Sequence, residues 1–393
     1  MFGSDAVATG IVDFQVSAIV LVIAALGCVY LLSAAVIVRR FKGVAGQHSR
    51  EPPGVTILKP LSGVAPPLYD DLASFCDQDY PGSLQVLLGV RDSADGAIEV
   101  VHRLIRERPG RELELVVHVS GSGPNPKIAN VIGMEHHIRH PVVILADADI
   151  LVSRTYVREI IAALNRPGVG AVTCMYRGSS GGGIWTRLAS MGIDYHFLPN
   201  VLVGLKLRLA QPCFGSTIAL RREMLDSVGG FQAFAACLAD DYAVGRAVRA
   251  TGMKVGISSL ILEHSCSEQS IAELLSHELR WARTVRAASP LGYAGLMISH
   301  PLPFAILGAT LSGLGLVGIG MVVAAIGCRL VLQWQVDHTL KISSDRWWLA
   351  PVRDLMAFGV YVAGFFVNVV QWGGQRYRIR SDGTLITLDE GTT

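Results

Sequence analysis

An uninterrupted apolar run, residues 16–38, constrains this chain more than any other feature of its sequence. The run carries no charge and exceeds the roughly 20 residues that a helix needs to cross a bilayer. It is followed at once by Arg39, Arg40 and Lys42, and clustered basic residues mark the cytoplasmic end of a span. A cleavable leader is disfavoured, because no basic segment precedes the run and no small-residue cleavage site follows it. Residues 1–42 are therefore predicted to form an N-terminal transmembrane anchor.

Two further apolar stretches, residues 303–327 and 355–372, are long enough to cross a bilayer. Three crossings place the N-terminus outside and bring a second basic cluster to the cytoplasmic side: Arg376, Arg378 and Arg380. We expect residues 291–393 to form a C-terminal membrane region with about two transmembrane helices and a basic cytoplasmic tail. A segment lying in the membrane plane, such as residues 291–300, is the alternative for part of this region. The chain is expected to be a multi-pass protein of the cell membrane, which is the inner membrane in a bacterium.

The composition fits a membrane protein and disfavours several other classes. Hydrophobic residues make up 51% of the chain and charged residues 17%, and the mean hydropathy is +0.42, which is more apolar than in ordinary soluble proteins. The net charge of +2 gives no electrostatic footprint for nucleic acid, so no nucleic-acid partner is expected. The seven cysteines include no Cys-x-x-Cys pair, which argues for reduced thiols and against a disulfide framework or a zinc site.

Between the apolar ends, residues 52–290 alternate between strand and helix patterns. This alternation predicts an α/β domain with a doubly wound, mostly parallel sheet. Ligands of such sheets bind at the carboxyl ends of the strands. The expected strands are residues 55–58, 84–90, 113–119 and 142–146, and the expected helices are residues 67–76, 98–108, 127–140 and 241–250.

The last of these strands runs directly into two carboxylates, Asp147 and Asp149. The strand reads as buried on both faces, and the two aspartates, two residues apart, point the same way. Carboxylates beside a core need a positive partner, and their hard oxygens suit Mg²⁺ or Mn²⁺. The pair therefore indicates a metal site that holds a nucleotide diphosphate. A solvated loop is the commoner explanation for an isolated Asp-x-Asp, so neighbouring motifs decide.

Three other features stand where a site at the sheet edge would need them. Asp92 follows a strand, although a turn or helix cap explains it equally. The pair Asp240–Asp241 opens a helical stretch, where acidic residues are also favoured by the helix dipole. In a later helix, Arg280 is suited to a diphosphate and Trp281 to the wall of a sugar or lipid pocket. A basic helix on lipid headgroups is the alternative for this segment.

Taken together and in this order, the motifs resemble family 2 and family 21 glycosyltransferases of GT-A fold, most of all the ceramide glucosyltransferases. The resemblance covers nearly the whole chain. Its most specific carriers are Lys-Pro-Leu-Ser-Gly at residues 59–63 and Asn-Pro-Lys-Ile at residues 125–128. The other carriers are Asp-Tyr-Pro at residues 79–81, Val-Gly-Gly-Phe at 228–231, Asp-Asp-Tyr at 240–242, and Arg280 with Trp281.

The resemblance implies a role for individual residues. Asp241 would be the catalytic general base, and Asp149 with Asp147 would bind the metal ion, Mg²⁺ or Mn²⁺. Donor binding would involve Lys59, Asp92, Lys127, Asp147, Arg280 and Trp281. His277 and His196 would serve the product or acceptor site. His277 departs from the family pattern, which has Gln or Arg at this place. The chain also keeps the second carboxylate of Asp-x-Asp, which the animal ceramide glucosyltransferases lack.

The expected function is inverting transfer of a sugar from a UDP-sugar to a hydroxyl of a membrane lipid by a cytoplasmic GT-A domain. In its overall sequence pattern, the chain is most similar to bacterial hopanoid-biosynthesis glycosyltransferases. This resemblance implies transfer of N-acetylglucosamine to bacteriohopanetetrol. Glucose transfer to ceramide is the alternative. A non-enzymatic membrane transport or binding protein is a distant third, because transporters carry more spans and polar groups at mid-membrane depth.

Overall fold

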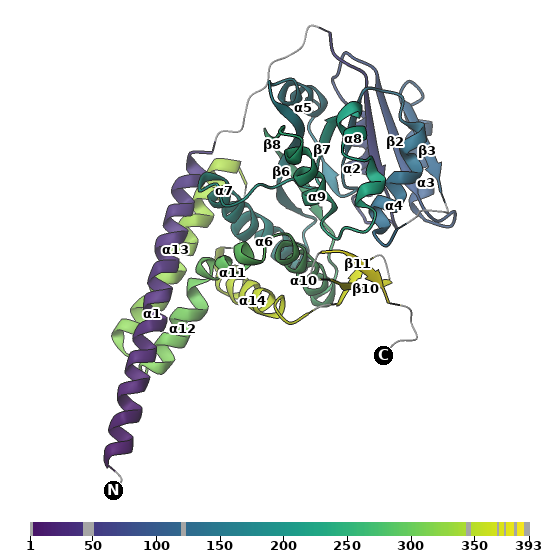
Figure 1. The fold of residues 1–393 in the computed structure, drawn as a ribbon. Coiled ribbons are helices and arrows are strands. Elements are labelled where there is room, and N and C mark those ends of the chain that lie inside the picture. The colour runs from purple at the N-terminus through teal and green to yellow at the C-terminus, as the bar shows by residue number, and fades with distance from the viewer. Residues whose placement is uncertain are drawn as a thin grey trace. The chain divides into compact units, whose positions relative to one another are not determined.

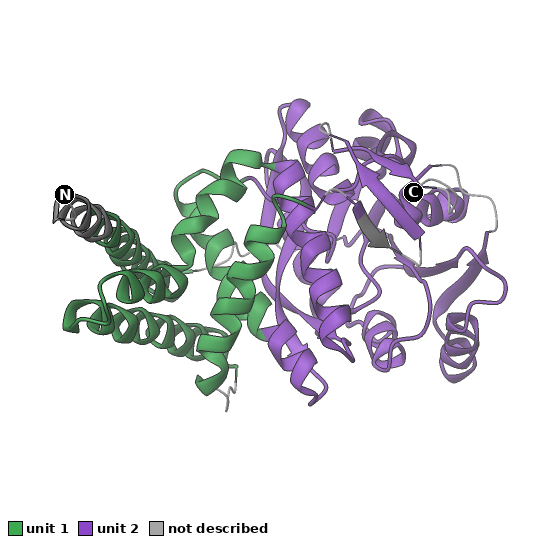
Figure 2. Ribbon diagram, turned by 90° about the horizontal axis from the view of Figure 1, so that it is seen from below, with its two compact units in different colours: residues 1–41, 191–210, 289–366 green, residues 42–190, 211–288, 367–393 purple. Residues whose placement is uncertain are grey.

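A computed structural model describes residues 3–41, 51–118, 123–342, 347–367, 369–372, 375–380 and 383–388, with side chains from residue 15 on except 370–372. The chain divides into two compact units, which are described separately (Figure 2). The helical unit consists of Met1–Phe41, Met191–Ala210 and Ser289–Phe366. The sheet unit consists of Lys42–Ser190, Gln211–Ala288 and Val367–Thr393.

The sheet unit is built on an eight-stranded sheet, counted over the described residues, with the order β3-β2-β1-β4-β7-β6-β8-β5. Its strands are β1 (Val55–Pro60), β2 (Leu84–Val90), β3 (Glu112–Val117), β4 (Val142–Leu145), β5 (Ile150–Leu151), β6 (Val169–Ser180), β7 (Ile218–Arg221) and β8 (Lys254–Cys266). Strands β1 to β4 pair in parallel, as do β6 and β8. Strand β7 runs antiparallel to β4 and β6, and β5 runs antiparallel to β8. The expected doubly wound, mostly parallel sheet is confirmed.

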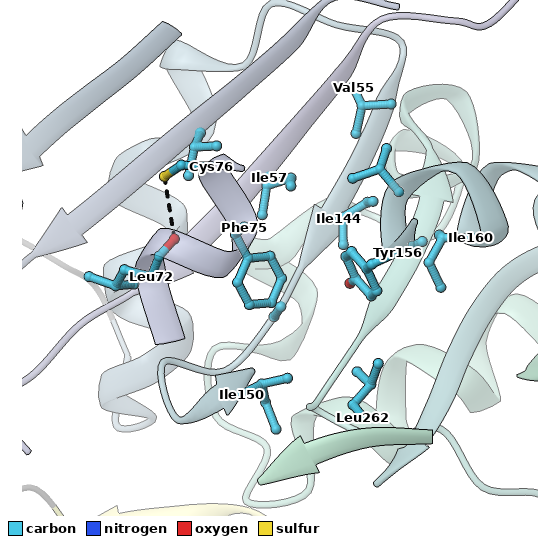
Figure 3. Packing of buried hydrophobic residues seen from close by; sticks show 14 of the residues in the cluster. Val55, Ile57, Leu72, Phe75, Cys76, Ile144, Ile150, Tyr156, Ile160 and Leu262 are labelled. Atoms are coloured by element: carbon cyan, nitrogen blue, oxygen red, sulfur yellow. Dashed lines mark hydrogen bonds between the residues drawn. The ribbon is translucent and has the colours of Figure 1, made fainter. Parts of the chain in front are cut away.

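Alternate residues of the central strands supply two separate cores, one on each face of the sheet. Ile57 and Ile144 point to one face, where they pack with Phe75 and Tyr156, whose rings lie 5.3 Å apart edge to face (Figure 3). Leu58 and its neighbours along the other strands form the core of the opposite face. This period-2 alternation of fully buried residues is what a parallel sheet covered on both faces requires.

Helices of the sheet unit cover both faces of the sheet (Figure 1). The first core includes residues of α2 (Leu68–Cys76), α3 (Ala97–Glu107) and α5 (Tyr156–Leu164). The second includes residues of α4 (Pro126–Met134), α8 (Arg222–Ser227) and α9 (Asp240–Ala250). The expected elements agree with these to within a few residues, with one larger difference. The helix expected over residues 127–140 ends at Met134 and continues as a 3₁₀ turn, Glu135–His137.

The C-terminal residues contribute a second, antiparallel sheet to the same unit. It has the order β11-β10-β9 and is formed by β9 (Val369–Trp372), β10 (Gln375–Ile379) and β11 (Leu385–Thr387). The expectation of one apolar span over residues 355–372 is therefore wrong. These residues contain the end of helix α14 (Ala350–Ala363) and then strand β9, whose backbone pairs with β10. Arg376 and Arg378, which were expected in a basic tail, belong to strand β10.

The helical unit contains the segments that are apolar enough for a membrane. Among the described residues, Gln15–Arg39 of α1 (Gly3–Arg39) and the whole of α13 (Leu316–Leu340) meet the length and hydropathy of a span. A pair of segments bent by 59°, Pro290–Ser299 and Pro301–Leu311, adds a third if the pair crosses as one. The span expected over residues 303–327 is wrong in its bounds. The chain turns at Gly313 and Leu314, both with positive φ, between α12 (Pro301–Leu311) and α13.

Small residues let the helices of this unit approach closely. Helix α1 runs beside α12 and α13 (Figure 1). A Cβ atom on Gly308 would lie 2.6 Å from the side chain of Leu21, and one on Gly318 would lie 2.6 Å from the backbone of Ala309. The hydroxyl of Ser17 donates to the carbonyl of Gly308 at 3.1 Å. Such packing is typical of helices that associate in lipid. The described residues of this unit also form η2 (Ile193–Phe197), α7 (Leu198–Lys206), α11 (Pro290–Gly295), η4 (Leu296–Ser299), η5 (Trp347–Leu349) and α14.

Candidate functional site

The loop after β4 carries Asp147 and Asp149 at the carboxyl end of the central strands, as expected. Two of its backbone carbonyl groups accept hydrogen bonds from other parts of the domain. The ammonium group of Lys59, on β1, donates to the carbonyl of Asp147, and the N–H of Ser265 donates to the carbonyl of Asp149 at 2.8 Å. Lys59 is fully buried over the ring of Phe75, and this burial lowers its pKa to about 8. In this structure Lys59 therefore anchors the loop.

Lys127 joins carboxylates from two parts of the chain. Its Nζ atom lies 2.6 Å from Oδ1 of Asp147 and 3.4 Å from Oδ2 of Asp240. Helix α4 places it there, because Asn125 caps the helix by accepting the N–H of Ile128 at 3.0 Å. The side-chain amide of Asn125 also donates to Oδ1 of Asp240 at 3.2 Å. Burial opposes the charge of Lys127, but the two carboxylates outweigh it and raise the pKa of the ammonium group.

Asp241 lies at the start of α9 and accepts two backbone hydrogen bonds. The N–H of Gly215 donates to Oδ2 at 2.9 Å, and the N–H of Tyr242 donates to Oδ1 at 2.7 Å. Burial, and then the charge of Asp240, raise the pKa of Asp241 to about 7. A carboxylate with this pKa is suited to accept a proton near neutral pH. Asp240 faces inward with 5% of its surface exposed, whereas Asp241 is half-buried.

Gly215 connects this carboxylate with the Asp-x-Asp loop. Its carbonyl accepts the N–H of Asp147 at 3.2 Å, while its own N–H binds Asp241. A Cβ atom at this position would lie 2.7 Å from Oδ2 of Asp147 and 2.9 Å from Nζ of Lys127. Only a residue without a side chain allows this approach. This glycine was not predicted as a site residue from the sequence.

His264 is a further site residue that sequence reasoning missed. Strand β5 pairs with β8 so that Ile150 lies opposite His264, and this pairing brings Nε2 to 3.3 Å from Oδ2 of Asp149. Although burial acts against protonation, the Asp149 carboxylate raises the pKa of His264. The two residues are far apart in the sequence and β5 is very short, so no local pattern indicates the contact.

Helix α10 (Ile271–Ala288) presents His277, Arg280 and Trp281 on one side. The rings of His277 and Trp281 lie 4.5 Å apart, and those of His264 and Trp281 lie 5.6 Å apart. Nδ1 of His277 lies 2.8 Å from Oε1 of Glu268. Burial lowers the pKa of Arg280, and the charges of Asp149 and other site carboxylates oppose that effect. The structure thus brings this helix to the carboxylate cluster.

Two of the expected site residues are not brought to this cluster. Asp92 is exposed, and its Oδ1 accepts the N–H of Ala94 at 2.8 Å, as in a local turn. His196 belongs to the helical unit, where its Nε2 lies 3.1 Å from Oδ1 of Asp354. Their roles in donor and acceptor binding stay predictions.

The aspartates fit a divalent cation that binds together with a phosphorylated ligand. Among the described residues, no group of three or more His, Cys, Asp and Glu side chains is arranged as a complete metal site. However, Oδ1 of Asp149 is buried and has no hydrogen-bond partner. Mg²⁺ commonly uses only one or two protein carboxylates and completes its shell with water and substrate phosphates. Asp147 and Asp149 supply that number.

A family model and known ceramide glucosyltransferases match this chain, some of them over most of its length. The model of the family described as glycosyl transferase family 21 matches residues 19–385. Ceramide glucosyltransferase 1 of Caenorhabditis elegans is 23% identical over 359 residues, which cover 86% of this chain and 75% of that protein. The ceramide glucosyltransferase of Candida albicans is 31% identical over 124 residues, covering 28% of this chain and 23% of that protein.

A solved structure shows the same fold. The mannosyltransferase PcManGT from Pyrobaculum calidifontis, in complex with GDP-Man and Mn²⁺, superimposes with a TM-score of 0.53. It is 18% identical, and the match covers 90% of this chain and 99% of that one. With the family match, this confirms the GT-A fold that the sequence predicted.

Proposed function

Because this chain belongs to glycosyl transferase family 21, we propose that it transfers a sugar from a UDP-sugar to a hydroxyl of a membrane lipid, with inversion at the anomeric carbon. The observation that carries this proposal is Asp241. It is a carboxylate with a pKa of about 7, fixed by two backbone N–H groups beside the Asp-x-Asp loop. The family to which the chain belongs consists of glycosyltransferases, which sets the class of the activity.

In the proposed reaction Asp241 accepts the proton of the acceptor hydroxyl as that oxygen attacks the anomeric carbon. A single base on the side opposite the leaving group leads to inversion. Lys127 and Arg280 would meet the departing diphosphate, whose negative charge grows during the reaction. Lys127 is already charged and held between Asp147 and Asp240, so it needs little rearrangement when the donor arrives.

Asp147 and Asp149 would hold Mg²⁺ or Mn²⁺ between them and the diphosphate. Such a cation neutralises the leaving group as a Lewis acid. The structurally similar mannosyltransferase contains Mn²⁺ with its nucleotide sugar, which supports this assignment. Without the donor, His264 and Lys127 balance the charges of the two aspartates.

A membrane lipid is the proposed acceptor because the chain has helices long and apolar enough to cross a membrane and its relatives include ceramide glucosyltransferases. These relatives favour glucose transfer to ceramide. The overall sequence pattern instead favours transfer of N-acetylglucosamine to bacteriohopanetetrol. The two proposals differ in both donor and acceptor, so one set of assays separates them.

The pairing of the C-terminus supports three membrane spans. The N–H of Leu238 donates to the carbonyl of Gly383 at 3.1 Å, so both residues lie on the same side of the membrane. The intervening segment Ser289–Phe366 must then cross an even number of times. If α13 is one crossing, the bent pair before it would be the other. Together with α1, we propose three spans with the N-terminus outside and the sheet unit in the cytoplasm, which the basic residues that follow α1 support.

The test is release of UDP by the detergent-purified protein, with UDP-glucose or UDP-N-acetylglucosamine and with ceramide or bacteriohopanetetrol. We expect release to require Mg²⁺ or Mn²⁺ and one donor–acceptor pair, and to disappear in Asp241→Asn. Mass spectrometry of lipids from a deletion strain would identify the natural product. A transport or binding protein would release no UDP with any pair, and that outcome would refute the proposal.

A further inference from the structure

The C-terminal strand β11 is hydrogen-bonded to the segment that leads into the catalytic aspartates. The N–H of Leu385 donates to the carbonyl of Ala236 at 2.9 Å, and the N–H of Leu238 donates to the carbonyl of Gly383 at 3.1 Å. Between these bonds, Cys237 and Thr384 form an antiparallel bridge. Residues 236–238 therefore act as a further edge strand of the small sheet.

Strand β10 pairs with the opposite edge of β11, where Ile386 of β11 lies opposite Arg378 of β10. Strand β11 thus lies between β10 and residues 236–238. Side chains reinforce this arrangement, because Leu238 and Leu385 are each only 4% exposed and pack together with Tyr377 and Ile379. The contact is a buried one and not a loose association of a tail.

The same segment is held from its other side by Asn125, which caps the helix of Lys127. The backbone N–H of Asn125 donates to the carbonyl of Ala235 at 3.0 Å, and its side-chain amide donates to the carbonyl of Cys237 at 2.7 Å. That amide also reaches Oδ1 of Asp240 at 3.2 Å. Residues 235–238 are therefore fixed between the C-terminal strand and the start of helix α4.

We propose that β11 is a positioning element for the general base, and that the N–H of Leu385 and the side chains of Leu385 and Leu238 hold the segment before Asp241 in its catalytic place. Asp241 is the second residue of α9 and lies three residues after Leu238, so a shift of this segment moves its carboxylate. Small displacements matter, since about 1 Å of misplacement can lower a rate by about 10²-fold. The inference rests on the proposed role of Asp241 as the base.

The matched experiment compares Leu385→Pro with Thr387→Pro. Proline at 385 removes the N–H that binds Ala236, whereas β11 bonds to β10 through its alternate residues, which keep their own N–H groups. Thr387 lies on the same strand two residues later, so its N–H faces the same edge, and its side chain is exposed. In the described part of the chain that N–H has no backbone partner outside its own sheet. Leu385→Ala is the milder second variant, because it keeps the N–H and removes the packing on Leu238.

For Leu385→Pro we expect kcat to fall at least about tenfold with an unchanged KM for the donor and unchanged UDP binding. Amide hydrogen exchange of residues 236–242 should become faster. Thr387→Pro should match the parent in both measurements, and Leu385→Ala should fall between them. If Leu385→Pro does not fold, Leu385→Ala against Thr387→Pro decides the question in the same way.

The proposal is overturned if Leu385→Pro keeps the parental kcat, if its donor KM rises in step with the loss of kcat, or if Thr387→Pro loses as much activity. Failure of the proposed function would look different. In that case Asp241→Asn would turn over normally, while the exchange measurement would still report whether β11 orders residues 236–242.

Discussion

Nε2 of His264 lies 3.3 Å from Oδ2 of Asp149, and this contact leaves Oδ1 of the same carboxylate buried without a hydrogen-bond partner. The protein thus orients one oxygen, and the other is the one that would bind the proposed cation. A histidine that fixes the orientation of a carboxylate in this way commonly accompanies metal binding.

We therefore predict that Asp149→Ala loses metal-dependent transfer while the protein still folds and inserts. The loss should be at least about 10²-fold, because the diphosphate then departs without its neutralising cation. Transfer rates at varied Mn²⁺ and a thermal melt measure the two effects. Asp226→Ala removes an exposed carboxylate on α8 and should behave as the parent. Metal-dependent activity that survives in Asp149→Ala would show that the metal lies elsewhere.

Gly215→Ala should be nearly inactive although the change is a single methyl group. The new Cβ would lie within 3 Å of both Asp147 and Lys127, so one of them must move. We expect the KM for the donor to rise and kcat to fall together, measured by UDP release. Gly181→Ala is the control, because a Cβ there meets no atom within 4 Å. Full activity in Gly215→Ala would mean that this part of the site rearranges at no cost.

The pH dependence of kcat should report the ionisation of Asp241. Burial raises the pKa of this acid to about 7, so it is protonated and inactive as a base below that value. The rate should therefore rise with pH and level off above about 7, with a slope near one per pH unit on the acid side. Rates from pH 5 to 9 at saturating donor test this. A flat profile would exclude Asp241 as the titrating base.

Substitution of the two neighbouring aspartates separates their roles. Asp241→Asn should lose about 10²–10⁴ in kcat and keep its affinity for UDP. Asp240→Asn should lose much less turnover, since Asp240 faces inward to Lys127 and Asn125. Its main effect should be on the KM for the donor, through Lys127. Single-turnover transfer and UDP titration distinguish the two variants, and the reverse pattern would exchange their assignments.

Local sequence patterns were sufficient for strands β1 to β4 and for the carboxylates that follow β4, whereas strands β5 to β8 were not predicted. A run such as Val142–Leu145 has few alternatives to a buried strand, and the residues directly after it must then lie at the carboxyl end of the sheet. Lys127 could be placed for the same reason, because Asn125 and Pro126 mark the start of its helix. In each case the residues that decide the position are neighbours in the sequence.

The features that sequence analysis missed depend on partners far away in the chain. His264 meets Asp149 only because a two-residue strand pairs with β8. Residues 369–372 end an apolar run of the sequence, but they form a strand that pairs with β10. Hydrophobicity alone does not distinguish these outcomes for short segments. The break at Gly313 was missed because glycine is also common inside membrane helices.

A buried ion pair in the helical unit supports the last prediction. Arg329, in the middle of α13, is 2% exposed, and its Nε lies 2.8 Å from Oδ1 of Asp354, which is 1% exposed. Its two terminal nitrogens donate to the carbonyls of Tyr195 and Ser299, each at 2.9 Å. One guanidinium group therefore joins four segments of the unit: η2, η4, α13 and α14. Charged groups in apolar surroundings are costly unless they are paired in this way.

Arg329→Met should destabilise the helical unit strongly, because it leaves the buried Asp354 carboxylate with only His196 beside it and removes the hydrogen bonds to the carbonyls of Tyr195 and Ser299. Breaking such a pair costs about 3–5 kcal/mol. Thermal unfolding in a mild detergent should begin at least about 5 °C lower. The double variant Arg329→Met, Asp354→Leu should recover much of this loss, since it removes both charges. Lys206→Met, an exposed cation in the same unit, should leave the melt unchanged. If the double variant is less stable than Arg329→Met alone, the remaining carboxylate is not the cause of the loss.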